Sequence, residues 1–187
     1  MSFMNRALFL VVPALVLALA PVPGLSPKAG EPLRAGHYGG PATGTWSVTS
    51  SPKWLRSVAL AAIGLREGLS EVPASGSCRG VIGLDVPGDG APITGAARCE
   101  FPGELARYND RVASLSATET AGGVSGTGSC CGGPAVDWKA TREGDRITGT
   151  ATGSTGVTPM SVETRFGSVE VSLRVDWTVR FVADRVP

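Results

Sequence analysis

The residues with the most evident chemistry are four cysteines, Cys78, Cys99, Cys130 and Cys131. In an oxidising compartment such cysteines form persistent disulfides, and four of them allow three connectivities. The chain has no C-x-x-C pair, and its only histidine, His37, lies in a segment rich in Gly and Pro. A zinc site is therefore not expected. We expect disulfides, no metal and no cofactor.

Groups for catalysis are scarce. A serine or cysteine nucleophile needs a base held beside it, and His37 is the only imidazole. Paired carboxylates are a second route to acid–base chemistry. The strand patterns described below place the acidic side chains on outward faces or turns, where they serve solubility. These are Asp137, Glu143, Glu163, Glu170, Asp176 and Asp184. We expect no catalytic residues.

The N-terminus has the layout of a secretory signal. A single charge, Arg6, precedes an apolar run over 7–20 and a Pro- and Gly-rich stretch over 21–24. The alternative is a membrane anchor, but a spanning helix needs roughly 20 apolar residues, and this run is shorter and contains Pro13. We expect a signal peptide over 1–24 and an extracytoplasmic protein, periplasmic or secreted, whose mature form does not span the membrane.

Charge and composition exclude some partners. The 17 basic and 16 acidic residues nearly balance, and no basic block is present. Nucleic acid and anionic membranes are therefore not expected as partners. The 26 glycines and 14 prolines indicate a turn-rich chain, and an aromatic content of 6% favours a small or shallow ligand cavity.

The elements begin after a leader. Residues 25–43 lack an apolar period and are predicted to be a flexible or surface-lying leader to one β-rich domain, 44–187. Residues 44–49 alternate as a half-buried strand does. Residues 52–67 read as one amphipathic helix that starts with Pro at its first position and ends at Gly68. Its apolar positions are Trp54, Leu55, Val58, Ala62 and Leu65.

Next comes a hairpin whose turn is predicted over 87–90. A single register places all of its apolar residues on one face. The expected pairs are Cys78 with Cys99, Gly80 with Ala97, Ile82 with Gly95 and Leu84 with Ile93. This register predicts a Cys78–Cys99 disulfide, the rival being a bond to Cys130 or Cys131. It also opposes Arg79 and Arg98, which is unfavourable.

Two further hairpins follow. The second turns at 144–145. Its expected pairs are Trp138 with Ala151, Ala140 with Gly149 and Glu143 with Arg146. The third turns at 167–168 and returns along 169–183, where apolar and mostly polar residues alternate as in a long strand with one buried face. Its expected pairs are Phe166 with Val169, Thr164 with Val171, Val162 with Leu173 and Arg165 with Glu170.

Two segments are ambiguous. Residues 102–118 show helical spacing, yet Asn109-Asp110 also suits a turn between two strands; we favour the helix. Residues 119–134 are rich in glycine and indicate an irregular loop or a poor strand around Cys130 and Cys131, which are either bonded to each other or not.

Together these patterns predict a mainly β fold: antiparallel hairpins forming a small barrel or curled sheet, with one amphipathic helix packed against it. The apolar face must be covered, and closure into a barrel, a second sheet or the helix of 52–67 would each cover it.

Two short motifs bear on function. Gly44-Thr45-Trp46 resembles the G-x-W that opens the first strand of lipocalins, and residues 147–150 resemble a strand of avidin-type barrels. The resemblance covers seven residues, and the helix after the first strand departs from both families. It implies at most a barrel that holds a small apolar ligand, with Trp46, Trp138 and Trp177 as lining residues. We favour the other interpretation, in which these indoles fill the core, because buried aromatic residues dominate ordinary cores.

One charged residue falls on the apolar side. Arg142 is expected opposite Ile147 near a strand end, where it can extend to water; anion binding is the alternative role. We therefore expect an exported, non-enzymatic, extracytoplasmic domain that binds a small ligand or an envelope partner. The alternatives are an outer-membrane β-barrel and, less favoured, a carboxylate-dependent hydrolase.

Overall fold

The computed structural model describes residues 32–130, 135–154, 157–165 and 167–187. The predicted signal peptide, Cys131 and Phe166 lie outside these ranges. The described strands are β1 (Gly36–Ser51), β2 (Ser75–Val86), β3 (Ile93–Glu100), β4 (Val112–Thr120), β5 (Gly123–Ser129), β6 (Val136–Glu143), β7 (Arg146–Ser154), β8 (Thr158–Thr164) and β9 (Gly167–Arg185). The described helices are η1 (Lys53–Leu55), α1 (Arg56–Glu67) and η2 (Gly103–Tyr108).

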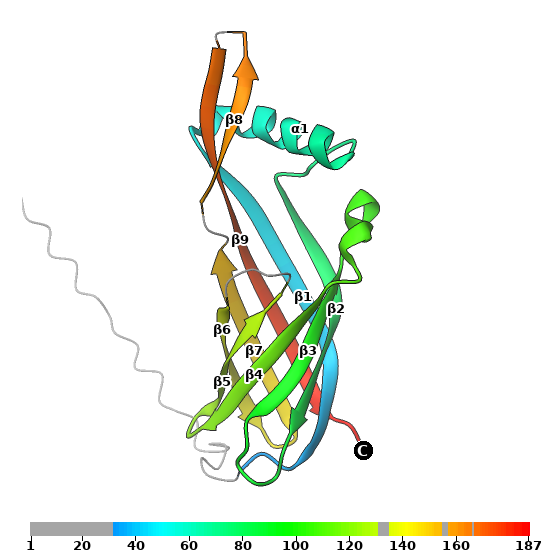
Figure 1. The fold of residues 1–187 in the computed structure, drawn as a ribbon. Coiled ribbons are helices and arrows are strands. Elements are labelled where there is room, and N and C mark those ends of the chain that lie inside the picture. The colour runs from blue at the N-terminus through cyan, green and yellow to red at the C-terminus, as the bar shows by residue number, and fades with distance from the viewer. Residues whose placement is uncertain (1–31, 131–134, 155–156, 166) are drawn as a thin grey trace, which may run out of the picture.

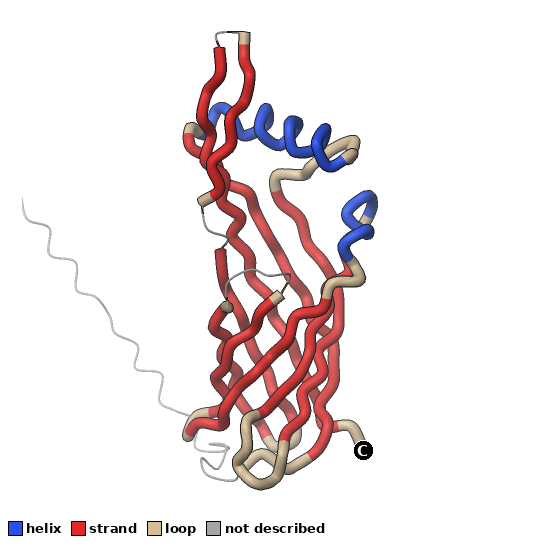
Figure 2. The backbone as a smooth tube through the Cα atoms, viewed as in Figure 1, coloured by secondary structure: helices blue, strands red, loops and turns tan. Residues whose placement is uncertain are grey.

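Eight of these strands close into an antiparallel barrel (Figures 1 and 2). Strands β1 to β7 follow one another around the wall, β9 comes next, and β9 pairs back onto β1, so that Trp46 lies opposite Trp177. Strand β8 pairs only with the outer part of β9. The predicted mainly β fold is confirmed, and closure into a barrel is how the sheet covers its apolar face.

The period-2 patterns decide which side chains enter the barrel. Along β9, Phe181 and Ala183 are buried inside the barrel and Val171 and Leu173 in the cluster that packs with α1, while Arg174 and Arg180 point outward. A strand in a closed wall has one dry face and one wet face, so alternation is the pattern that such a fold requires.

The two ends of the barrel differ. At the end we call closed, β2 and β3, β4 and β5, and β6 and β7 are joined by short turns. The start of β1 and the end of β9 also lie there, where the Val186 N–H donates to the His37 carbonyl at 2.8 Å. The opposite, open end carries α1, η2 and the β8–β9 hairpin (Figure 1).

A compact apolar core fills the closed half. Tyr38, Leu84, Ile147 and Ala183 are fully buried there, and the Tyr38 hydroxyl donates to the Arg34 carbonyl at 3.0 Å. This burial raises the pKa of Tyr38 above its ordinary value. The barrel is therefore solid at this end.

The helix forms where the sequence predicts it but buries a different face. It ends at Gly68, whose φ of 67° caps it in the left-handed conformation. Its buried residues are Ala59, Leu60 and Gly64, which with Leu55 of η1 pack outside the barrel against the ends of β1, β8 and β9. Of the residues predicted to form its apolar face, Trp54, Val58 and Leu65 are exposed. Both sides of α1 carry apolar residues, so the spacing could not decide between them.

The first hairpin keeps the predicted face but not the predicted register. Gly80 pairs with Cys99, Ile82 with Ala97 and Leu84 with Gly95, two residues away from the expected alignment. The turn covers all the residues between Val86 and Ile93, so it is longer than the expected tight reversal. The observed register replaces the Arg79–Arg98 opposition by Arg79 opposite Glu100, which removes the like-charge contact.

Of the other two hairpins, one has the predicted register and one does not. In the second, Trp138 opposite Ala151, Ala140 opposite Gly149 and Glu143 opposite Arg146 are confirmed. In the third, the predicted register is wrong by four residues. The observed pairs are Thr164 with Gly167, Val162 with Val169, Met160 with Val171, Ser161 with Glu170 and Thr158 with Leu173. A shift by an even number leaves every side chain on its predicted face.

Two segment assignments are corrected. Strand β1 begins at Gly36, inside the predicted leader 25–43, because residues 36–43 pair with β2. The helix favoured over 102–118 is wrong: η2 takes its first part and β4 its second. In the glycine-rich segment, β5 forms a strand along β4 and β6, where its small residues allow close approach.

Candidate ligand cavity in the open half of the barrel

The open half of the barrel is hollow. A lower cavity of about 290 Å³ lies directly above the packed core. An upper cavity of about 640 Å³ lies between it and the open end. Both are lined mainly by apolar side chains. The two share the wall residues Ala42, Ala97, Ala113, Cys130, Trp177 and Val179 and therefore adjoin; we call the two together the barrel cavity.

Small residues on neighbouring strands make this space. Ala97 comes from β3, Ala113 from β4 and Ala151 from β7, each at an inward position. Side chains of this size cannot reach the barrel axis. The sequence therefore leaves a void in the open half that larger residues fill in the closed half.

Two aromatic rings form the floor. The Trp138 and Phe181 rings meet edge to face, with centroids 5.7 Å apart and planes inclined by 73°. Both residues are buried. Phe181 fits because Gly149 on β7 has no side chain, since a Cβ there would lie 2.1 Å from the Phe181 ring. The floor is thus rigid and apolar.

The cavity brings together the three tryptophans predicted as lining residues. Trp138 lines the lower cavity, Trp46 the upper one and Trp177 both. Trp46 and Trp177 are half-buried and rest against Gly76 and Gly153 of the adjacent strands. The indole N–H groups of Trp46 and Trp138 are buried without a hydrogen-bond partner in the described structure.

The fourth predicted ligand-binding residue, Arg142, lies elsewhere. It points inward opposite Ile147, as predicted, but near the closed end. Its guanidinium donates to Glu119 Oε1 at 2.6 Å, and the same oxygen accepts the Leu33 N–H at 2.7 Å. Arg142 therefore holds the chain that enters β1 and does not line the barrel cavity.

Cys78 and Cys99 sit in the cavity wall near the open end and are joined by a disulfide. Their sulfurs lie against Gly44, where a Cβ would come within 2.6 Å of the Cys78 Sγ. Cys130 lines both parts of the cavity. The pairing proposed for Cys130 and Cys131 involves a residue outside the described ranges.

The lip of the cavity comes from the β3–β4 connection, which the sequence patterns did not single out. Phe101, Tyr108 and Arg111 line the upper cavity there. The Ser70 N–H donates to Glu104 Oε2 at 2.6 Å, and this hydrogen bond lowers the pKa of the exposed Glu104 carboxyl. It ties η2 to the loop after α1. The helical spacing over residues 102–118 predicted a helix in this segment, but such spacing carries no information on where the segment lies relative to the cavity.

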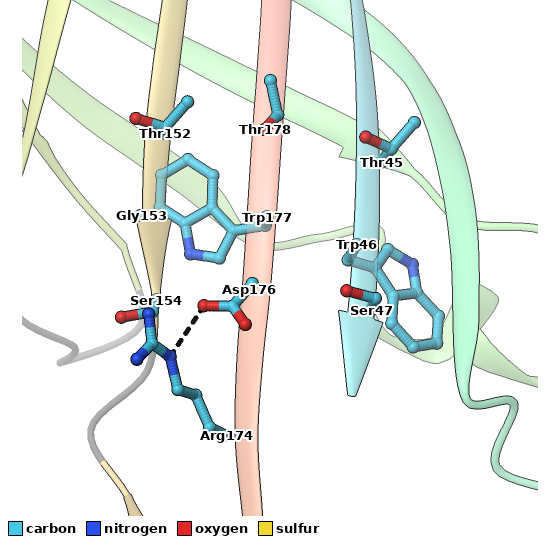
Figure 3. A pocket seen from close by; sticks show the side chains of 10 residues that line it. All are labelled: Thr45, Trp46, Ser47, Thr152, Gly153, Ser154, Arg174, Asp176, Trp177 and Thr178. Carbon is cyan, nitrogen blue, oxygen red and sulfur yellow. Dashed lines mark hydrogen bonds and ion pairs between the residues drawn. The ribbon is translucent and has the colours of Figure 1, made fainter. Parts of the chain in front are cut away.

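The outer wall is mostly polar. A shallow hollow across β7, β9 and β1 is lined by hydroxyl side chains, by the Trp46 and Trp177 indoles and by the Arg174–Asp176 ion pair, whose atoms are 2.7 Å apart (Figure 3). The six carboxylates predicted to face outward occupy such positions or turns. On the exposed surface, His37 Nδ1 lies 2.8 Å from Asp85 Oδ1.

No protein-family model, curated protein or solved structure matches this chain. Within the described ranges, no group of three or more His, Cys, Asp or Glu side chains is placed to hold a metal ion. No helix in those ranges is long and apolar enough to cross a membrane. What remains as a site is a deep apolar cavity with a floor of aromatic rings and a polar lip, an arrangement suited to binding.

Proposed function

We propose that this protein is an exported, non-enzymatic binding protein that holds a small apolar molecule in its barrel. The observation that carries the proposal is the barrel cavity, whose parts measure about 290 and 640 Å³. Ligand sites are typically concave, mostly apolar and of roughly 300–1,000 Å³. A void lined by Trp138, Phe181 and alanines favours a hydrocarbon chain or a slender ring system.

Export is supported by two features. Residues 1–24 have the layout of a secretory signal. The Cys78–Cys99 pair is compatible with an oxidising compartment outside the cytoplasm, because disulfides seldom persist inside it. The proposal therefore places the protein in the periplasm or outside the cell.

The polar outer wall favours water over lipid around the barrel. An outer-membrane barrel needs an outward apolar band about 25 Å tall. The outward residues of β4, β7 and β9 are instead mostly hydroxyl-bearing or charged, with Val112 and Val182 as apolar exceptions. The polar examples are Ser114, Ser116, Thr118, Thr148, Thr150, Thr152, Glu170, Arg174, Thr178 and Arg180.

Titration with N-phenyl-1-naphthylamine, a neutral apolar dye that fluoresces when it leaves water, tests the proposal. We expect saturable binding to the wild-type protein. The Ala97→Phe variant fills the wall between the two parts of the cavity and should lower the affinity at least about tenfold. The matched control is Ala96→Phe, because Ala96 is the exposed neighbour that points outward. Equal affinity in both variants, or no binding to the folded wild type, would exclude the barrel cavity as the site.

A second candidate function, contact with an envelope protein, is favoured by α1. On its outer side Leu65 is 85% exposed and Val58 43%, and Trp54 of the preceding η1 is 71% exposed. A helix that is apolar on both faces is normally covered.

A photoactivatable amino acid in place of Leu65, compared with one in place of the exposed barrel residue Val81, tests this candidate in cells. We expect a discrete crosslinked species from position 65 alone. No adduct at 65, or the same adducts at both positions, would remove this candidate.

A further inference from the structure

One arginine at the lip of the barrel cavity has no carboxylate partner among the described residues. The Arg111 guanidinium carbon lies 4.5 Å from the centroid of the Tyr108 ring. The Arg111 N–H also donates to the Tyr108 carbonyl at 3.2 Å, which fixes the two residues as a unit. Both line the upper cavity.

The neighbouring cations are already engaged. Arg98 donates to Glu100 at 2.9 Å, and Arg107 donates to the Glu67 carbonyl at 2.7 Å. Arg111 takes part in none of the ion pairs found among the described residues. The structure therefore leaves a positive charge at the entrance of an otherwise apolar space.

Stacking on Tyr108 leaves the edge of the Arg111 guanidinium available. The ring face attracts the cation and reduces its freedom to rotate. The N–H groups on the edge can still donate two parallel hydrogen bonds to a carboxylate or a phosphate oxygen pair. Few polar groups in a mostly apolar pocket typically set the orientation of the ligand.

We propose that the ligand is an amphiphile with an acyl chain and an anionic head group. The chain occupies the barrel cavity and ends against Trp138 and Phe181. The head group binds Arg111 at the lip. This inference rests on the proposed function and adds to it the chemical class of the ligand. The small wall residues Ala42, Ala97 and Ala113 suit a chain better than a bulky ring system.

The test uses competition against N-phenyl-1-naphthylamine, below the micelle-forming concentration of each competitor. The competitors share a twelve-carbon chain and differ in head group: dodecanoate, dodecanol and dodecylamine. We expect dodecanoate to displace the dye from the wild type at a concentration about tenfold lower than dodecanol, and dodecylamine to be the weakest. The preference for the acid should shrink as salt is added, since Arg111 is exposed.

The variant Arg111→Gln should bring dodecanoate to the level of dodecanol and leave dodecanol itself unchanged. Arg180→Gln is the control, because it removes the same charge from an exposed outward position on β9; it should keep the preference for the acid. Equal displacement by acid and alcohol in the wild type, or an unchanged preference in Arg111→Gln, overturns the inference while dye binding still supports the barrel cavity. If the dye does not bind to the wild-type protein, that result contradicts the proposed function itself.

Discussion

Cys78 and Cys99 lie diagonally across β2 and β3, because Cys99 pairs with Gly80, yet their Cα atoms are only 5.6 Å apart. A diagonal pair of residues normally lies about 7–8 Å apart. The Cα distance falls within the usual range for disulfides. The predicted bond is thus present although the predicted register is not.

The disulfide should stabilise the barrel. It links residues 21 positions apart in sequence. A closed loop of that length is worth roughly 3 kcal/mol in the chain-entropy account. We expect the double variant Cys78→Ser, Cys99→Ser to lose about this free energy of unfolding in urea titrations. Peptide mapping without reduction should recover a fragment that joins the two residues, whereas a Cys99–Cys130 fragment would contradict the bond.

Gly149 should tolerate no side chain. A methyl group there would overlap the Phe181 ring on the cavity floor, and overpacking of this kind typically costs about 1–3 kcal/mol. We expect Gly149→Ala to lower the free energy of unfolding by that amount. Gly122→Ala is the control, since a Cβ at Gly122 meets nothing within 4 Å; its effect should stay within about 0.5 kcal/mol. Equal destabilisation by the two variants would mean that the Phe181 ring can move to accommodate the added methyl group.

The two faces of β9 should respond differently to truncation. Leu173 is 7% exposed within the cluster that holds α1, so Leu173→Ala should cost about 2–5 kcal/mol. Arg174→Ala removes an exposed side chain and should cost about 0.5 kcal/mol or less. Trp177→Ala should cost less than loss of a fully buried indole, because Trp177 is only half-buried. Denaturant titrations of the three variants measure these changes in the free energy of unfolding. A large loss of stability in Arg174→Ala would contradict the prediction.

The anchor of η2 should weaken in acid. The pKa of Glu104 is lowered in the folded protein from an ordinary value of 4.5, because its carboxylate accepts the Ser70 N–H. The stabilisation is therefore present above pH 4.5 and is lost as the pH falls through the lower, folded value. We expect the protection of the Ser70 amide against hydrogen exchange, relative to its intrinsic rate at each pH, to fall over that range.

The comparison variant for this pH effect is Glu104→Gln, whose side chain does not titrate. Its exchange at Ser70 should show no acid step, while the rest of its pH profile follows the wild type. An identical acid step in both proteins would assign the effect to another group.

The faces of the strands could be predicted from sequence better than the alignment between them. Alternation correctly placed Trp138 and Phe181 inside the barrel and Leu173 on a buried face, because burial has the same period as the strand. Register depends on how each turn closes, and shifts by two or four residues keep the same faces. The Arg79–Arg98 opposition argued against the predicted register of the first hairpin without indicating another, and the structure pairs Arg79 with Glu100 instead.

The site was predicted in part for a related reason. The tryptophans are large and inward, so alternation found them. The void depends on alanines from separate strands, such as Ala97 and Ala151, lying at the same level of the barrel. The pattern along a single strand contains no information on that level. Arg142 points inward, as predicted. Its role depends on its position along the barrel axis, which puts it near the closed end. That position follows from the stagger of all eight strands.

The pairing of β1 with β9 has a practical consequence for attachment. The chain enters β1 and leaves β9 side by side at the closed end, where the Val186 N–H bonds to the His37 carbonyl. A reporter domain or a solid support joined after Pro187 would therefore stand at the far end from Arg111. An immobilised barrel would present its lip to the surrounding solution, an orientation suited to a sensor for amphiphiles.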